Sequence, residues 1–178
     1  MLLRDVTVPL ENARHLPAET ASFMSIESVR AFFAEYAPDI TVIESPLSSA
    51  TVTLAAEAFG VEPGRIAKTL SLRIGDRVVL IVAAGTSRMD NKKVKAHFGG
   101  KPKMLGVDEV ADITGHEVGG VCPFGLKTPL PVFCDVSLQA FDEVVPAAGS
   151  THSAVRIAPM RMAELTAAEW IDVCEHRG

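Results

Sequence analysis

The hydrophobic and polar positions of this chain follow helical spacing in some segments and strand spacing in others. The first helix is predicted to run to Tyr36, capped by Ser25, because Ile26, Val29 and Phe33 fall on one stripe of a helical surface. Further helices are expected at 51–59, ended by Gly60, and at 91–98, capped by Asp90 and stopped by Gly99 and Gly100. A short helical turn is expected at 108–113, and a last helix from about residue 160.

Strand spacing dominates the middle of the chain. Residues 66–74 alternate between two faces, and Gly75 with Asp76 makes a tight turn into a second run at 77–84. Shorter strands are expected at 40–44, 131–135, 143–147 and 154–158. Because strands and helices intermix around a central hairpin, we expect the α+β class, with a single mixed, mostly antiparallel sheet flanked by helices.

The length of 178 residues suits one domain with one hydrophobic core. We expect that domain to span residues 24–178, after a poorly packed N-terminal arm at 1–23. No apolar run approaches the ~20 residues that cross a bilayer, and charges and prolines interrupt the arm, so it is not a signal peptide. Three cysteines at unrelated spacings favour a reducing cytoplasm, and no metal site and no cofactor are expected.

The charge distribution is uneven. The net charge is −5, yet residues 88–103 hold six basic residues against Asp90 alone. A basic patch on an acidic body can meet a phosphate backbone, but the same run can also be an ordinary solvated helix face. Arg88, Lys92 and Lys93 are its candidates for contact with nucleic acid.

The segment 115–125 is unusually rich in glycine and contains His116, Cys122 and Pro123. Glycine permits positive φ angles, so such a segment can hold backbone N–H groups fixed for an anion or oxyanion, although it can also be a tight surface turn. A thiolate–imidazole pair of Cys122 with His152 is conceivable, but nothing in their sequence separation supports contact.

Lys68 interrupts an apolar strand face that it shares with Leu70 and Leu72. An ammonium buried there needs a partner, so its head either reaches a cavity or an anion, or extends into water at the start of the strand. His152 lies in a second glycine-containing turn, 147–154, which suits an open site or a turn without a function.

Three segments, 64–70, 114–125 and 148–154, together resemble the YbaK/EbsC family, the freestanding relatives of the editing domain of bacterial prolyl-tRNA synthetase. The similarity runs from about residue 25 to residue 173. The resemblance implies a single α+β domain that hydrolyses the ester of mischarged aminoacyl-tRNA, typically tRNA(Pro). It implies that Lys68 contacts the tRNA 3′ end and that the loop from Gly119 through Gly120 to Pro123 holds the ester through backbone groups.

The resemblance also implies a substrate pocket and a mechanism. His152 and Gly149 would shape the pocket, Val121 and Cys122 would line it, and the patch at 88–103 would meet the acceptor stem. The ribose 2′-hydroxyl would assist a water, or a cysteinyl thiol would attack its own ester, so no protein nucleophile is needed.

The resemblance leaves the partners, the substrate and the catalytic character open. The implied partners are aminoacyl-tRNA and prolyl-tRNA synthetase, with no membrane and no DNA. The amino acid removed can be alanine, cysteine, serine, threonine or 2-aminobutyrate. The alternative is a noncatalytic module that binds a tRNA 3′ end or a synthetase.

Overall fold

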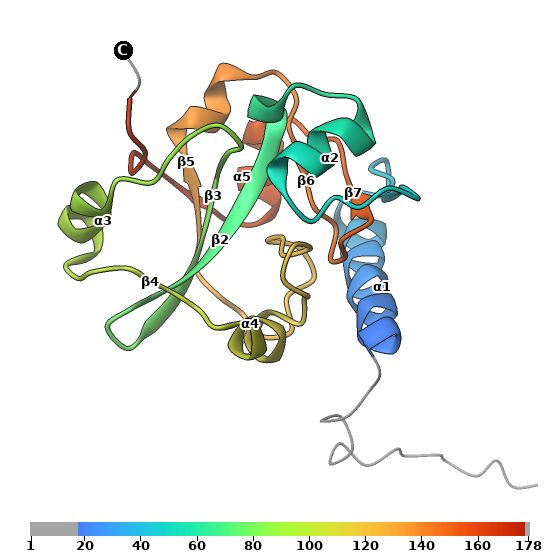
Figure 1. The fold of residues 1–178 in the computed structure, drawn as a ribbon, viewed down its shortest axis with the longest axis horizontal. Helices are drawn as coiled ribbons and strands as arrows, with labels where there is room; N and C mark the ends of the chain where they lie inside the picture. The colour runs from blue at the N-terminus through green and yellow to red at the C-terminus, as the bar shows by residue number, and fades with distance from the viewer. Residues whose placement is uncertain (1–17, 177–178) are drawn as a thin grey trace, which may run out of the picture.

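The structure, a computed structural model, describes residues 18–176 of the chain (Figure 1). The helices in this part are α1 (Ala18–Tyr36), α2 (Val52–Phe59), α3 (Asn91–Phe98), α4 (Val107–Thr114) and α5 (Pro159–Leu165). Thr51 caps α2 and Asp90 caps α3, each accepting backbone N–H groups through its side-chain oxygen, and Gly60 and Gly99 end these helices with positive φ angles. The predicted second and third helices are therefore confirmed.

The predicted start of the first helix is wrong. Helix α1 begins at Ala18, and Ser25 lies inside it. The segment 18–24 contains no glycine or proline that would stop a helix, so helical conformation continues upstream of the expected cap. The expected arm at 1–23 thus overlaps α1 at 18–23, and its residues 1–17 lie outside the described residues.

The main sheet is built on the hairpin of β2 (Ile66–Ile74) and β3 (Arg77–Ala84). Its strand order is β4-β2-β3-β5-β8, where β4 is Lys103–Met104, β5 is Val132–Asp135 and β8 is Glu169–Ile171. Strand β6 (Val145–Pro146) pairs with the start of β2, and β1 (Ile43–Glu44) pairs separately with β7 (Ser153–Ala154). Two 3-10 segments, Pro63–Arg65 and Val136–Ala140, link these elements.

The α+β class with a mixed sheet is confirmed. Strand β2 is antiparallel to β3 and β4, while the pairs β2–β6, β3–β5 and β5–β8 are parallel. Parallel pairing enters because helices or long crossovers join these strands, whereas β2 and β3 are joined by a tight turn.

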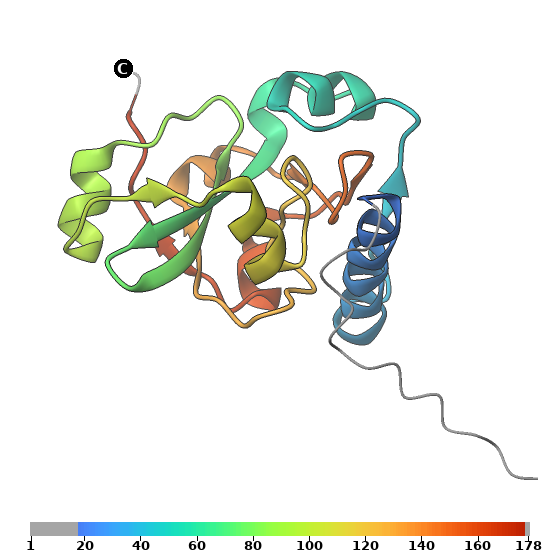
Figure 2. The same cartoon turned by 60° about the horizontal axis from the view of Figure 1, so that its bottom comes forward.

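Both faces of the central hairpin are covered. On one face Leu72 and Ile81 pack with Val94 of α3. On the other face Leu80 packs in a larger core with Phe33 of α1 and Phe124, whose ring centroids are 4.7 Å apart. Figures 1 and 2 accordingly place α3 and α1 at opposite sides of the molecule.

One edge of β2 is only partly covered. Strand β6 pairs with it at Ile66 and Ala67, and β4 pairs with it at Leu72 and Arg73. Between these pairings no strand of the described chain lies against that edge at residues 68–71. This gap in the sheet edge positions the site described next.

Candidate active site

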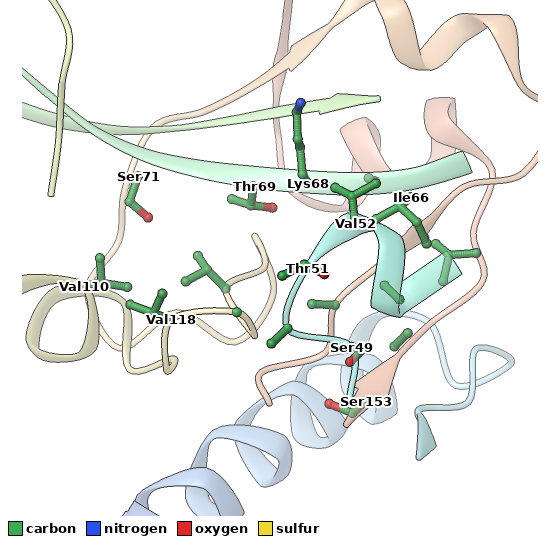
Figure 3. A pocket seen from close by; sticks show the side chains of 18 of the residues that line it. Ser49, Thr51, Val52, Ile66, Lys68, Thr69, Ser71, Val110, Val118 and Ser153 are labelled. Carbon is green, nitrogen blue, oxygen red and sulfur yellow. The ribbon is translucent and has the colours of Figure 1, made fainter. Parts of the chain in front are cut away.

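A cavity of about 340 Å³ opens at the gap in the edge of β2 (Figure 3). Helix α2 and residues 49–51 form one wall, and α4 with the loop 118–121 forms another. Strand β2 and the segment 145–154 complete it. Apart from Lys68 its lining residues are apolar or hydroxyl-bearing: Ser49, Ala50, Thr51, Val52, Ala55, Phe59, Ile66, Ala67, Thr69, Ser71, Met104, Leu105, Val107, Val110, Val118, Gly119, Val121, Val145, Ala147, Ser153 and Ala154.

The two faces of β2 differ at the cavity. Thr69 and Ser71 lie on the cavity side, whereas the Lys68 side chain points to the opposite side of the strand (Figure 3). The carbonyl of Ser71 accepts the N–H of Leu105 at 3.0 Å on the partly covered edge. Since backbone groups of every second residue point to the same edge, those of Thr69 face the gap.

Lys68 is half-buried on the side of Leu70 and Leu72. Its ammonium donates to the carbonyl of Gly85 at 3.2 Å and to the carbonyl of Ser87, both in the loop after β3. Burial lowers the pKa of Lys68 below its ordinary value. Its backbone borders the cavity while two of its three N–H donors support the loop 85–87.

Three hydroxyls of the cavity wall have no hydrogen-bond partner among the described residues. They belong to Ser49, Thr69 and Ser71, and each oxygen is buried. Ser49 is 6% exposed and Ser71 only 3% exposed. Buried polar groups are normally paired, so three unpaired hydroxyls around one cavity indicate a surface prepared for a polar ligand.

The loop 118–121 borders the same cavity and contains unpaired backbone donors. Gly119 has a φ of +90°, and a Cβ at that position would lie 3.0 Å from the Cβ of Ala50. The N–H groups of Gly119 and Val121 have no acceptor in the described part of the chain. Two amides fixed in this way at a cavity wall can receive a developing oxyanion.

Gly120 locks this loop against the second glycine turn. Its N–H donates to the carbonyl of Glu117 at 2.9 Å, and its own carbonyl accepts the N–H of Gly149 at 3.0 Å. A Cβ at Gly120 would lie 2.6 Å from the backbone of Ser150, so only glycine fits. The Glu117 carboxylate adds a bond from the N–H of Thr151 at 2.9 Å.

The buried side chain of His116 connects the glycine-rich segment 115–125 to helix α1. His116 is fully buried, with Nε2 2.8 Å from the carbonyl of Phe124 and Nδ1 2.7 Å from the hydroxyl of Ser25. The Ser25 hydroxyl also donates to the carbonyl of Gly149 at 2.5 Å, so α1 holds both glycine segments together. Burial lowers the pKa of His116 below its ordinary value.

Cys122 lies in the same buried layer and not in the cavity wall. Its sulfur is 3.6 Å from Nε2 of His116 and 3.6 Å from the carbonyl of Phe124. Burial raises the pKa of the Cys122 thiol to about 12, so the thiolate is scarce at neutral pH. Its recorded contacts do not include His152, so the structure does not bring these two residues together as a nucleophilic pair.

Some of the site residues expected from the sequence border the cavity, and others do not. Lys68, Gly119 and Val121 border the cavity. The cavity lining in the described chain omits Gly120, Cys122, Pro123, Gly149 and His152. The exposed His152 ring has Nδ1 3.0 Å from the hydroxyl of its neighbour Thr151 and lies outside the cavity lining.

The basic patch lies on the side of the sheet that α3 covers. Lys92 is exposed without an ion pair among the described residues, and Arg88 is exposed with its guanidinium 3.9 Å from Glu175. The Lys93 ammonium is occupied, because it bonds Asp172 at 2.8 Å and the carbonyl of Cys174 at 2.8 Å. Of the three candidates named from the sequence, Arg88 and Lys92 are therefore available to a phosphate, and Lys95, Lys101 and Lys103 of the same patch are exposed as well.

No group of three His, Cys, Asp or Glu side chains in residues 18–176 is arranged to hold a metal ion. None of the described helices is long and apolar enough to cross a membrane.

The sequence reasoning missed Ser49, Thr69 and Ser71. The signal was present, since Thr69 and Ser71 alternate with apolar residues on one strand. Such alternation ordinarily indicates a solvent-facing side, and here that side forms the cavity wall.

Comparison with known proteins agrees with this architecture. Residues 48–165 match the family described as the aminoacyl-tRNA editing domain. The chain is 50% identical over 154 residues to the uncharacterized protein YwhH of Bacillus subtilis (strain 168), covering 85% of this chain and 98% of YwhH. It is 28% identical over 158 residues to EbsC of Enterococcus faecalis, named provisionally as a Cys-tRNA(Pro)/Cys-tRNA(Cys) deacylase, covering 87% of this chain and 93% of EbsC.

A solved structure supports the same relationship. A crystal structure described provisionally as a trans-editing enzyme for prolyl-tRNA synthetase superposes with a TM-score of 0.80 at 32% identity, covering 85% of this chain and 98% of that one. The family match at 48–165 includes the entire cavity lining, from Ser49 to Ala154. The predicted relationship is confirmed, and this chain belongs to the aminoacyl-tRNA editing domain family of the YbaK/EbsC type.

Proposed function

We propose that this chain hydrolyses the ester of mischarged aminoacyl-tRNA, with tRNA(Pro) carrying a small noncognate amino acid as its substrate. The observation that carries the proposal is one cavity bordered both by Gly119 and Val121, whose N–H groups are unpaired in the described chain, and by three unpaired hydroxyls. The provisional descriptions of EbsC and of the trans-editing structure support the choice of tRNA(Pro).

In the proposed reaction a water oxygen attacks the ester carbonyl carbon, assisted by the 2′-hydroxyl of the terminal ribose. The carbonyl oxygen gains negative charge and accepts the N–H groups of Gly119 and Val121. The bond to the ribose 3′-oxygen then breaks, and the proton lost by the water goes to that oxygen. The products are the free amino acid and an uncharged tRNA, and the buried Cys122 thiol takes no part.

The tRNA contacts in this proposal come from three basic residues. The Lys68 ammonium lies on the side of β2 opposite the cavity, where two of its N–H donors bond loop carbonyls, and it offers the third to a tRNA phosphate that runs past the outer side of the strand. Arg88 and Lys92, exposed on the surface, contact the acceptor stem. Prolyl-tRNA synthetase supplies the mischarged substrate, which places the activity in the cytoplasm.

The test is a deacylation panel with tRNA(Pro) charged with alanine, cysteine, serine, threonine or 2-aminobutyrate, and with proline as the cognate control. Release from at least one noncognate substrate, with prolyl-tRNA(Pro) spared, is expected. If the folded protein releases none of them, the proposed hydrolysis is wrong. Binding of tRNA(Pro) without release would support the noncatalytic module instead.

A further inference from the structure

The unpaired hydroxyls of the cavity carry an inference about which amino acid is removed, and it rests on the proposed function. We propose that the cavity selects an aminoacyl group with a hydroxyl on its side chain, serine or threonine, and that Thr69 and Ser71 bind that hydroxyl. Both residues stand on the cavity side of β2 (Figure 3).

The buried hydroxyls of the described chain fall into two classes. Those of Ser25, Thr114, Ser150 and Ser153 are all bonded within the protein. Those of Ser49 and Ser71 are buried as deeply but have no partner, and both line the cavity, as does the unpaired hydroxyl of Thr69. An unpaired buried hydroxyl destabilises the fold, so its placement at a ligand cavity indicates a partner on the ligand.

Position separates the roles of the three hydroxyls. Ser49 adjoins Ala50, against which Gly119 packs, so Ser49 lies near the loop that receives the ester. The α-amino group sits next to the ester carbon, and Ser49 is the hydroxyl placed to accept from it. Thr69 and Ser71 lie on the strand across the cavity, where a side chain of the amino acid would extend.

The residues around Ser71 restrict which amino-acid side chain this end of the cavity can bind. Leu105 and Val110, which line the cavity with Ser71, are both buried and apolar. No carboxylate or guanidinium belongs to the cavity lining in the described residues, which disfavours a charged amino-acid side chain. A single hydroxyl, surrounded by aliphatic groups, matches this end of the cavity.

Hydroxyl chemistry then sets the order of substrates. A substrate hydroxyl both donates and accepts, so it can pair with Thr69 and Ser71 at once. Alanine and 2-aminobutyrate, which lack it, leave both protein hydroxyls unpaired, and the thiol of cysteine is a weak donor and acceptor. We expect kcat/KM for seryl-tRNA(Pro) to exceed that for alanyl-tRNA(Pro) by about 10–100-fold.

Paired substrates and single substitutions test the inference. Seryl-tRNA(Pro) is compared with alanyl-tRNA(Pro), and threonyl-tRNA(Pro) with 2-aminobutyryl-tRNA(Pro), since each pair differs by one hydroxyl. Ser71→Ala and Thr69→Val remove the protein's side of the bond while keeping its volume similar. Each variant is expected to reduce the preference for the hydroxylated substrate by about 10-fold, while hydrolysis of the apolar partner is kept or increased.

Ser153→Ala is the matched control, because it removes a hydroxyl from the same cavity that is already bonded to Ser150 at 2.8 Å. It should change hydrolysis of both members of a pair alike and leave their ratio unaltered. Equal or faster hydrolysis of the apolar substrates by the wild type would overturn the inference. So would equal losses for both members of each pair in Ser71→Ala and Thr69→Val. Release without hydroxyl preference leaves the proposed function standing, whereas no release from any substrate removes both.

Discussion

On one face of β2, Leu72 is fully buried against Val79 and Val94, and the Lys68 ammonium donates to two loop carbonyls. On the other face, one residue away in sequence, Thr69 and Ser71 turn unpaired hydroxyls toward a cavity. The Lys68 ammonium on the first face is paired within the protein, whereas the Thr69 and Ser71 hydroxyls on the second face are not.

This difference separates stability from recognition within a single strand. The paired face is complete without a ligand, so changes there should alter folding first. The unpaired face gains its hydrogen bonds when a ligand arrives, so changes there should alter substrate choice first.

The largest effect is expected for Leu72→Ala. Removing a fully buried leucine side chain leaves a cavity in the packed face, and we expect the free energy of unfolding to fall by about 2–5 kcal/mol. Urea denaturation measures it. The neighbouring Ser71→Ala is the matched control, expected to keep or raise that free energy by up to about 1 kcal/mol because it removes an unpaired hydroxyl. Similar losses of unfolding free energy in Leu72→Ala and Ser71→Ala would contradict the difference between the two faces of β2.

Lys68→Ala tests whether the paired face also serves the substrate. We expect kcat/KM for deacylation to fall by about 10–100-fold, since the proposed phosphate contact is lost. Lys68→Arg, which keeps the charge, should recover part of that loss. Thermal unfolding of both variants checks the loop 85–87. Full activity in Lys68→Ala would leave the lysine with a purely structural role.

A smaller effect is expected from His116, a paired polar group beneath the loop. Because burial lowers the pKa of His116 in the folded state, the unfolded chain binds a proton more readily as the pH falls. The free energy of unfolding should therefore be highest above the ordinary histidine pKa and decrease by about 1 kcal/mol as the pH falls from about 6.5 to about 5.5. Urea denaturation across this range, on the wild type and on His116→Gln, should show this decrease only in the wild type. A decrease of the same size in both proteins would assign it to other groups.

The smallest effect is expected for Cys122→Ala. The thiol pKa of about 12 keeps Cys122 protonated at neutral pH, so deacylation by the folded variant should stay within about twofold of the wild type. Steady-state kinetics on the preferred substrate measures it. A variant that folds but no longer hydrolyses the ester would instead return the thiol to the mechanism.

Much of the fold could be predicted from the sequence, because a few adjacent residues determine where many of its helices and turns begin or end. The cap at Asp90 and the turn at Gly75 are set by a few adjacent residues. The start of α1 and the parallel strand pairs were less accessible, since they depend on helix continuation and on contacts between distant segments.

In the site, too, features set by adjacent residues could be predicted, and features set by distant contacts could not. The glycine loop could be found from composition, because only glycine tolerates the φ of Gly119 and the close contact at Gly120. The burial of Cys122 depends on packing under α1, and the cavity role of Ser71 depends on a gap between two strands. Neither is encoded by nearby residues.

That gap also bears on how the protein avoids unwanted association. An uncovered strand edge is a template on which another chain can add a strand and begin aggregation. Here β6 and β4 pair with β2 on both sides of residues 68–71, and Leu105 also bonds the Ser71 carbonyl, so the open edge is shorter than about 13 Å. An edge of that length offers too few ladder bonds to hold a foreign strand, while a single aminoacyl group can still enter.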